Sequence, residues 1–276
     1  MNTPIAGLHA HNEYSLLDGA GSALQHATAA AEAGYVALAE TNHATLAGSL
    51  HHIAACRKVG IMPISGCEVY YRPNRKVQGK KEWLKVYYHL TLHAKDERGW
   101  RNLMAIVSES HDTGFYGKAC VDDELLEKYA DGLICLTGCV GGRLMKSINS
   151  GDDRQANAWL DQLQRIFRDD LFVEIMPHAL DLSQVGNVEA VRMANHRGIG
   201  IVATNDQHYP TAEWAPTQDI LLMIATNQTV KKREAKRAEG EDIYTFDIKT
   251  LYHQSAGEMR AEFIKKDRKS GSAGMP

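Results

Sequence analysis

Short apolar runs alternate with longer amphipathic stretches along most of the chain. Seven runs have the length and composition of buried strands, at residues 5–10, 35–41, 61–71, 86–93, 132–137, 171–176 and 199–204. Between them, stretches such as 22–33, 46–58, 97–110 and 155–167 carry apolar residues at three- and four-residue spacing, which predicts helices. This alternation is typical of βα units around a buried parallel sheet or barrel.

Several of the predicted strands follow a glycine of the kind that ends a helix, namely Gly34, Gly60, Gly132 and Gly198. Seven strands in regular alternation favour a distorted seven-stranded βα barrel of the α/β class. A doubly wound open sheet is the alternative, because both folds produce the same pattern. We expect residues 1–264 to form one domain and residues 265–276, which end in a Gly/Ser-rich stretch, to be a disordered tail.

The composition adds limits on compartment and partners. The 276 residues include 44% hydrophobic residues and carry a net charge of -3, which excludes a uniformly basic nucleic-acid coat protein. The longest apolar stretch, 220–226, is far below the roughly 18 residues of a membrane span, and the N-terminus lacks a signal-peptide pattern. Five cysteines without a Cys-x-x-Cys pair indicate a reducing compartment. We therefore expect a cytoplasmic protein with no membrane partner.

The unusual number is 13 histidines, and many of them follow predicted strands. In a βα barrel the loops after the strands converge on one face, which carries the chemistry. Six of the seven strands supply metal-capable side chains at or after their ends: His9, His11, Asp18, His43, Glu68, His89, Cys139, Asp206 and His208. His, Asp, Glu and Cys are ligands of zinc and its neighbours, and nine exceed one tetrahedral site. The pattern predicts a cluster of two or three metal ions.

Each of these residues has a plainer explanation when taken alone. The pair His9 and His11 would suit a strand surface, Glu68 a salt bridge, and Cys139 a buried apolar thiol. Their shared placement at strand ends favours the metal cluster. Two further histidines, His93 and His178, also lie near strand ends and stay undecided, and six others are interpreted as solvated: His26, His51, His52, His111, His196 and His253.

Other catalytic motifs are missing from the sequence. It contains neither a Gly-x-Ser-x-Gly nucleophile elbow nor a phosphate-binding Gly-x4-Gly-Lys-[Ser/Thr] loop. A formal dinucleotide fingerprint at residues 198–203 runs into a strand, whereas a functional one leads from a strand into a helix. Serine hydrolases, P-loop enzymes and dinucleotide-dependent enzymes are therefore disfavoured.

Seven segments in this order resemble the PHP (polymerase and histidinol phosphatase) domain, in the version found at the N-terminus of bacterial DNA polymerase III alpha subunits. They are LHAHNEYSLLDG at 8–19, AETNH at 39–43, ISGCEVY at 64–70, HLTL at 89–92, GWRNL at 99–103, GLICLTGC at 132–139 and VATNDQHY at 202–209. The resemblance covers residues 5–264. It implies a distorted seven-stranded barrel with up to three divalent ions (Zn, Mn or Fe), and its nine ligand positions fall on the nine residues named above.

The resemblance also has consequences for activity. Many polymerase alpha subunits have lost several of the ligands, so the intact set here favours catalysis. Asn42 departs from the pattern, because the family usually has Asp there. A carboxylate at that position would orient an imidazole, and its loss is expected to weaken one metal site without abolishing it.

Clustered divalent ions generate a hydroxide nucleophile from water and neutralise phosphate charge, which indicates phosphoester hydrolysis. A basic stretch follows the strand that carries Glu68, and one further arginine follows Cys139: Arg72, Arg75, Lys76, Lys80, Lys81 and Arg143. These cations are candidates for binding a DNA backbone, with a solvated charge run as the alternative. Together with the resemblance they predict a 3'→5' exonuclease of the proofreading type, acting on single-stranded 3' ends.

The length of 276 residues leaves no room for a polymerase module, so polymerisation by this chain alone is not expected. The chain would be a standalone protein, one part of a split polymerase with a separate polymerase subunit as partner, or a truncated piece. Two rival functions are a small-molecule phosphatase of the histidinol-phosphatase type and a non-catalytic, metal-stabilised module of a split polymerase.

Overall fold

The fold was analysed in a computed structural model, which describes residues 4–76, 86–177, 181–239 and 249–270. All seven predicted strands are present, and an eighth, the two-residue β5, was not predicted. The strands are β1 (Ile5–Gly7), β2 (Tyr35–Glu40), β3 (Met62–Tyr71), β4 (Tyr88–Ala94), β5 (Cys120–Val121), β6 (Leu133–Leu136), β7 (Leu171–Ile175) and β8 (Gly200–Ala203).

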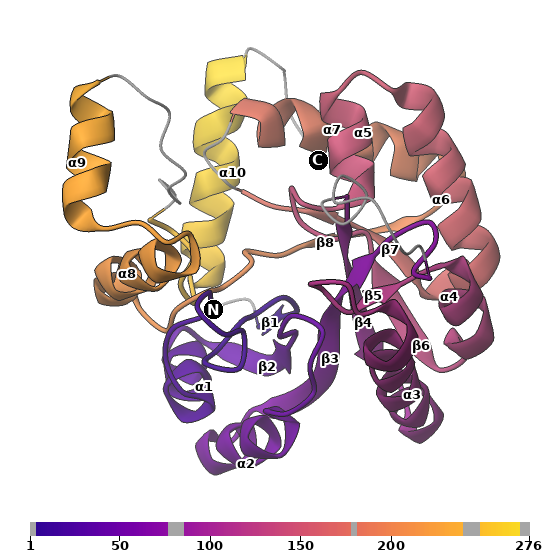
Figure 1. The fold of residues 1–276 in the computed structure, drawn as a ribbon, viewed down its shortest axis with the longest axis horizontal. Coiled ribbons are helices and arrows are strands. Elements are labelled where there is room, and N and C mark those ends of the chain that lie inside the picture. Colours follow the sequence, from indigo (N-terminus) through magenta and orange to yellow (C-terminus); the bar gives the residue numbers. More distant parts are fainter. Residues whose placement is uncertain (1–3, 77–85, 178–180, 240–248, 271–276) are drawn as a thin grey trace.

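The strands form one curled sheet in the order β1-β2-β3-β4-β6-β7-β8, with β5 paired to β3 beside this path. A parallel bridge between Ala10 and Gln207 joins the segments that follow β1 and β8, the two ends of the path. Helices lie around the outside of the strands (Figure 1). The predicted α/β fold with a distorted seven-stranded barrel path is confirmed.

One strand runs in an unexpected direction. β4 is antiparallel to both β3 and β6, whereas the other pairs along the path are parallel. The expectation that the metal-capable residues lie at or after the ends of their strands is therefore wrong for His89, which lies near the start of β4 opposite Tyr70. Because β4 is reversed, its start lies at the same end of the barrel as the ends of its neighbours.

The helices are α1 (Ala23–Glu32), α2 (Ser49–Val59), α3 (Glu97–Gly114), α4 (Asp123–Tyr129), α5 (Arg143–Asn149), α6 (Asp153–Phe167), α7 (Asp181–Arg197), α8 (Ala215–Ala225), α9 (Val230–Ala238) and α10 (Ala256–Ser270). The four predicted helices match α1, α2, α3 and α6. The tail expected from residue 265 begins as helix, because α10 continues to Ser270, and 271–276 lie outside the described residues. No helix in the described part of the chain is long and apolar enough to cross a membrane.

Local sequence signals explain where elements begin and meet. α1 starts at a capping box in which Ser22 and Gln25 each bond the other's backbone N–H. Gly60 ends α2 in the left-handed conformation, with φ of 81°. A Cβ on Gly99 would lie 1.8 Å from the backbone oxygen of Gly132, so only glycine allows α3 to approach the loop before β6 this closely.

Three histidines interpreted as solvated are buried, which corrects that interpretation for His26, His52 and His253. The ring of His26 contacts the Ala20 carbonyl oxygen and the Nε2 atom of His253, each at 2.9 Å. The ring of His52 contacts the Leu38 carbonyl oxygen at 2.9 Å. These rings lie within the packed faces of α1 and α2, where backbone partners replace water. The undecided His93 is also buried, and His178 lies outside the described residues.

Candidate metal centre

The nine predicted metal-capable side chains converge at one end of the barrel, with the Glu68 carboxylate at their centre. His43 Nδ1 lies 2.9 Å from Glu68 Oε2, while His89 Nδ1 and His9 Nε2 lie 3.1 and 3.3 Å from Oε1. Cys139 Sγ is 3.6 Å from the same oxygen. One carboxylate from the middle of β3 therefore touches ligand-type atoms from four other segments of the chain.

Two further carboxylates complete the cluster. Asp206 Oδ1 lies 3.3 Å from Nε2 of both His9 and His11. Asp18 Oδ2 lies 3.0 Å from His43 Nε2 and 3.2 Å from His208 Nε2. Three groups have ligand atoms within 4.8 Å of one another, namely His9 with His11 and Asp206, His11 with His43 and Glu68, and Glu68 with His89 and Cys139.

Backbone geometry positions several of these side chains. Asp206 has a φ of 49°, a conformation that non-glycine residues rarely adopt and that is concentrated at functional sites. Its backbone oxygen lies 2.7 Å from His208 Nδ1 and so orients that ring. In the loop after β6, the Gly141 backbone N–H donates to Cys139 Sγ at 3.3 Å, which favours the thiolate form of the cysteine.

The charges within the cluster shift the pKa values of its members in opposite directions. Burial alone would lower the pKa of His43, but the charges of Glu68 and Asp18 outweigh burial and raise it to about 10. Burial of His208 is outweighed in the same way by Asp18 and Asp206, and its pKa is about 9. Burial would raise the pKa of Glu68, yet the surrounding imidazoles hold it well below its usual range. The acids and imidazoles thus compensate one another's charge within a buried site.

The donor set fits divalent metal ions. Six inward-facing atoms are buried and lie at ion-pair distance from other members of the cluster, but make no hydrogen bond of normal geometry among the described residues: His9 Nε2, His11 Nε2, Asp18 Oδ2, His43 Nδ1, Glu68 Oε2 and Asp206 Oδ1. Polar atoms left in this way are costly unless something coordinates them. Imidazole, carboxylate and thiolate ligands together suit zinc and first-row metals. The cluster is most exposed over three residues, since Asp18 and His89 are each 21% exposed and His43 is 16% exposed, against 13% for Asp206.

A buried carboxylate outside the predicted set holds one ligand in place. Glu174 on β7 is fully buried, and its Oε1 lies 2.8 Å from His9 Nδ1. The same oxygen accepts a hydrogen bond from the hydroxyl of Thr204, the residue after β8, at 2.6 Å. This contact keeps the proton on Nδ1 and directs His9 Nε2 to the cluster. An acidic residue inside the apolar strand at 171–176 was the signal for it in the sequence.

Replacing Glu174 with glutamine is expected to weaken metal binding by roughly 10- to 100-fold, because the neutral amide polarises the His9 ring less. Titration of the metal-free protein with Zn²⁺ or Mn²⁺ against a chelating dye measures the change. Glu127→Gln on the exposed surface of α4 is the matched control. Equal affinities for the two variants would show that Glu174 does not tune the site.

Asn42 takes part in a hydrogen-bond chain that ends at His11. The Ser15 hydroxyl donates its hydrogen to Asn42 Oδ1 at 3.0 Å. The Ser15 oxygen therefore serves as an acceptor: it accepts from the backbone N–H of His43 and lies 2.9 Å from His11 Nδ1. Burial and the charge of His43 lower the pKa of His11 to about 4, so this ring is neutral and carries one hydrogen. Ser15 therefore places that hydrogen on Nδ1 and leaves Nε2 free to bind a metal.

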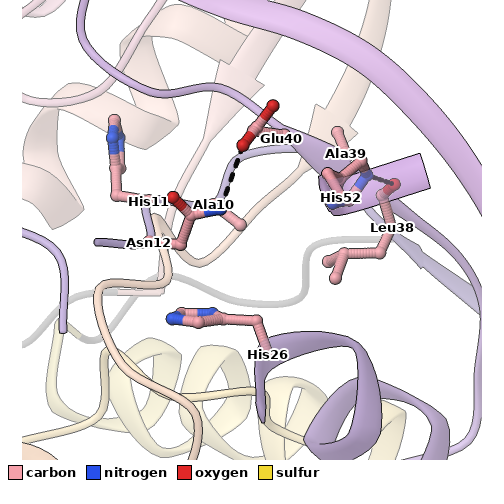
Figure 2. A pocket seen from close by; sticks show the side chains of 8 residues that line it. All are labelled: Ala10, His11, Asn12, His26, Leu38, Ala39, Glu40 and His52. Atoms are coloured by element: carbon pink, nitrogen blue, oxygen red, sulfur yellow. Dashed lines mark hydrogen bonds between the residues drawn. The ribbon is translucent and has the colours of Figure 1, made fainter. Parts of the chain in front are cut away.

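Glu40 supplies the negative charge behind this chain. Its Oε1 accepts from Asn42 Nδ2 at 2.8 Å and from Asn12 Nδ2 at 3.0 Å. Figure 2 shows the Asn12 to Glu40 contact beside His11, at a cavity of about 10 Å³, the size of one water molecule. The Glu40 carboxylate therefore does not contact His11 directly. The Asn42 side-chain amide connects this carboxylate to the Ser15 hydroxyl, which contacts the His11 ring.

Changing Asn42 to Asp is expected to weaken metal binding by roughly tenfold or more, although Asp matches the family pattern. Two carboxylates would then meet at the 2.8 Å contact with Glu40, and like charges at that distance cannot both stay ionised. In the double variant Glu40→Gln with Asn42→Asp, the glutamine amide can donate to the aspartate carboxylate, so a hydrogen bond is restored between the two positions. This variant is expected to recover metal affinity. The same metal titration tests this, and tighter binding by the single variant would contradict it.

The basic residues predicted to bind substrate have other partners as well. Arg75 is buried and paired with Asp122 and Glu124, and Lys76 pairs with Glu124 at 2.8 Å. Arg72 is buried, with Nε donating to the Val86 carbonyl oxygen. Arg143 is half-buried against the rings of Tyr71 and Trp159, and Lys80 and Lys81 lie outside the described residues. A role for these six in substrate binding stays a prediction.

Comparison with known proteins places the chain in a family. The family model for the PHP domain matches residues 7–178. DNA polymerase III alpha subunits of Treponema pallidum and Thermus aquaticus are 37% and 35% identical over 239 and 261 residues, or 86% and 93% of this chain. The chain spans only about a fifth of the length of these relatives, 20% and 21%.

Two solved structures are more distantly similar. An amidohydrolase from Chromobacterium violaceum is 17% identical with a TM-score of 0.46, covering 74% of this chain and 88% of its own. A protein described as a metal-dependent phosphoesterase from Bifidobacterium adolescentis is 14% identical with a TM-score of 0.45, covering 74% and 87%. The family match over more than half of the chain is decisive, and the chain belongs to the PHP domain family.

Proposed function

We propose that this chain is a metal-dependent phosphoesterase that removes nucleotides from the 3' ends of single-stranded DNA. The observation that carries the proposal is the convergence of nine ligand-type side chains at one end of the barrel, with the Glu68 carboxylate at their centre. When bound, two or three divalent ions (Zn, Mn or Fe) supply Lewis acidity that activates water and neutralises phosphate charge.

The chain's own residues divide into anchoring and opening groups. His9 and His11 are fully buried, and Glu174 and Ser15 fix their tautomers, so they define the floor of the site. Asp18, His43 and His89 are the most exposed of the nine residues, so a phosphate enters over them. Glu68 lies between the floor and the opening and holds the ligand sets at fixed spacing. No separate general acid or base is assigned.

DNA as the substrate rests on the relatives, which are subunits of a DNA polymerase. Because this chain matches about a fifth of their length, the proofreading role and a separate polymerase subunit as partner are part of the proposal. The cytoplasmic location expected from the sequence also belongs to it. The five free cysteines support that location.

The test is hydrolysis by the metal-loaded full chain. A 5'-labelled single-stranded oligonucleotide is expected to shorten stepwise from its 3' end with Mn²⁺ or Zn²⁺, and chelator, His9→Ala or Asp206→Ala is expected to stop the reaction. Hydrolysis of p-nitrophenyl phosphate alone would replace the proposal with a small-molecule phosphatase. Full metal occupancy that raises the melting temperature without hydrolysing either substrate would replace it with a structural metal module.

A further inference from the structure

A rim of aromatic rings and lysines borders the open side of the metal cluster, on the flank of His43 and His89. Tyr70 is stacked on His43, with ring centroids 5.3 Å apart and planes 17° apart. Tyr87 is stacked on His89 at 6.2 Å and 7°, and it meets Tyr70 edge-on at 5.0 Å. Aromatic rings therefore pack against two of the three most exposed residues of the cluster.

Two lysines flank these rings. Lys118 Nζ lies 4.8 Å from the ring centroid of Tyr70 and 3.1 Å from its hydroxyl. Lys146 Nζ lies 3.3 Å from the Tyr87 carbonyl oxygen, one helical turn beyond Gly142, which bridges His89. Both lysines are exposed, and neither is paired with a carboxylate within the part of the chain that the structure describes. Their charges are therefore available to an anion, whereas Lys76, Lys95 and Lys128 are neutralised by acidic partners.

An exposed ring lies next to Lys118. Phe115 is 56% exposed and stacked on His111 at 5.8 Å. Phe115 forms a β-bridge with Ala119, the residue after Lys118. His111 Nε2 contacts the carbonyl oxygen of Ala44, the residue after His43, and so connects this surface to the cluster. Phe115 and Lys118 therefore place an exposed aromatic face and an ammonium group next to each other on this flank of the cluster.

We propose that Phe115, Lys118, Tyr87 and Lys146 form the binding site for the single-stranded nucleotides next to the scissile phosphate. Lysines that track a backbone, combined with aromatic faces on which bases stack, are how proteins hold a single strand without reading its sequence. A compact phosphomonoester would reach the metals without touching this rim. This inference rests on the proposed function and names the residues that would give that site its preference for a nucleic-acid strand.

The experiment measures binding separately from hydrolysis. Fluorescence anisotropy of a labelled single-stranded oligonucleotide, with the full chain in chelator, reports affinity without turnover. Phe115→Ala is expected to weaken binding by roughly 5- to 100-fold, the range for loss of one stacked base. Lys118→Ala combined with Lys146→Ala is expected to weaken binding and to lower the slope of log affinity against log salt by about 1.4, or 0.7 for each phosphate contact. Lys58→Ala, at the far end of α2, is the control.

A second readout separates this inference from the proposed function. Hydrolysis of bis(p-nitrophenyl) phosphate by the metal-loaded variants is expected to equal that of the wild type, because the rim lies outside the ligand set. Rim variants that bind the oligonucleotide as tightly as the wild type would overturn the inference, even if the wild type degrades DNA. Rim-dependent binding by a protein that hydrolyses neither substrate would support the inference while the proposed function fails.

Discussion

Glu68→Gln is expected to leave the protein folded, close to metal-free, and reduced in hydrolysis by about a thousandfold or more. Glu68 contacts the imidazoles of His9, His43 and His89, and it also contacts the Cys139 sulfur. The glutamine side chain keeps only one acceptor oxygen at this position. Its NH2 group is a donor, and it would face imidazole nitrogens that have to bind a metal ion. Folding survives because the imidazoles can release the protons that the Glu68 charge stabilises, and then need no counter-charge.

The decisive measurement is metal content by elemental analysis after dialysis, alongside circular dichroism and oligonucleotide hydrolysis. Glu97→Gln, on an exposed turn of α3, controls for loss of one negative charge. Metal content equal to the wild type in the Glu68 variant would contradict a central role for this carboxylate. Loss of metal with full hydrolysis would contradict the metal-dependent mechanism.

Metal affinity is expected to fall steeply as the pH is lowered. At pH 7 the metal-free protein carries extra protons on His43 and His208, whose pKa values are about 10 and 9, and on His9, where the charges of Asp206, Glu174 and Glu68 outweigh burial and raise the pKa well above its usual value. Cys139 is also protonated, because burial raises the pKa of its thiol well above the usual value. A metal needs the unprotonated atoms, so loading the cluster releases these four protons. Each released proton changes log affinity by about one for each pH unit, so overall affinity drops by about ten-thousandfold per unit.

Calorimetric titration with Zn²⁺ in buffers of different protonation enthalpy counts the released protons directly. His43→Gln is expected to release one proton fewer than the wild type, which ties the count to a named residue. Affinity that is independent of pH between pH 6 and 8 would show that these groups are not protonated in the metal-free protein.

The alternation of strands and helices was sufficient to predict the seven main strands, and the polar residues near the strand ends are the nine side chains that the structure brings together. Their role as metal ligands stays a prediction. The spacing of apolar residues predicts the strands, and the position of polar residues near the strand ends predicts the site, because both patterns are visible in the local sequence. The direction of β4 was not predictable, since an apolar run reads the same way in either direction. The burial of His26 and His52 was also missed, because His253 and the Leu38 carbonyl oxygen come close to these two rings only after the chain has folded.

The residues that support the ligands were the least accessible to prediction. Glu174 reaches His9 from a strand far along the sequence, and Glu40 acts on His11 only through Asn42 and Ser15. The predicted cations show the converse problem. A basic stretch identifies charge, but whether Arg75 meets a substrate or the carboxylate of Asp122 is decided by tertiary packing.

The reversal of β4 has a consequence for engineering. Because β3 ends and β4 begins at the metal-bearing end, the connection between Tyr71 and Tyr88 leaves and re-enters the barrel beside the cluster. Tyr71 and Tyr88 are themselves paired in the β3–β4 ladder, so the ladder alone sets the register of Glu68 and His89. Substitutions at positions 73 and 74, which follow β3 and are exposed, would therefore alter the entrance to the cluster while the strand register stays the same.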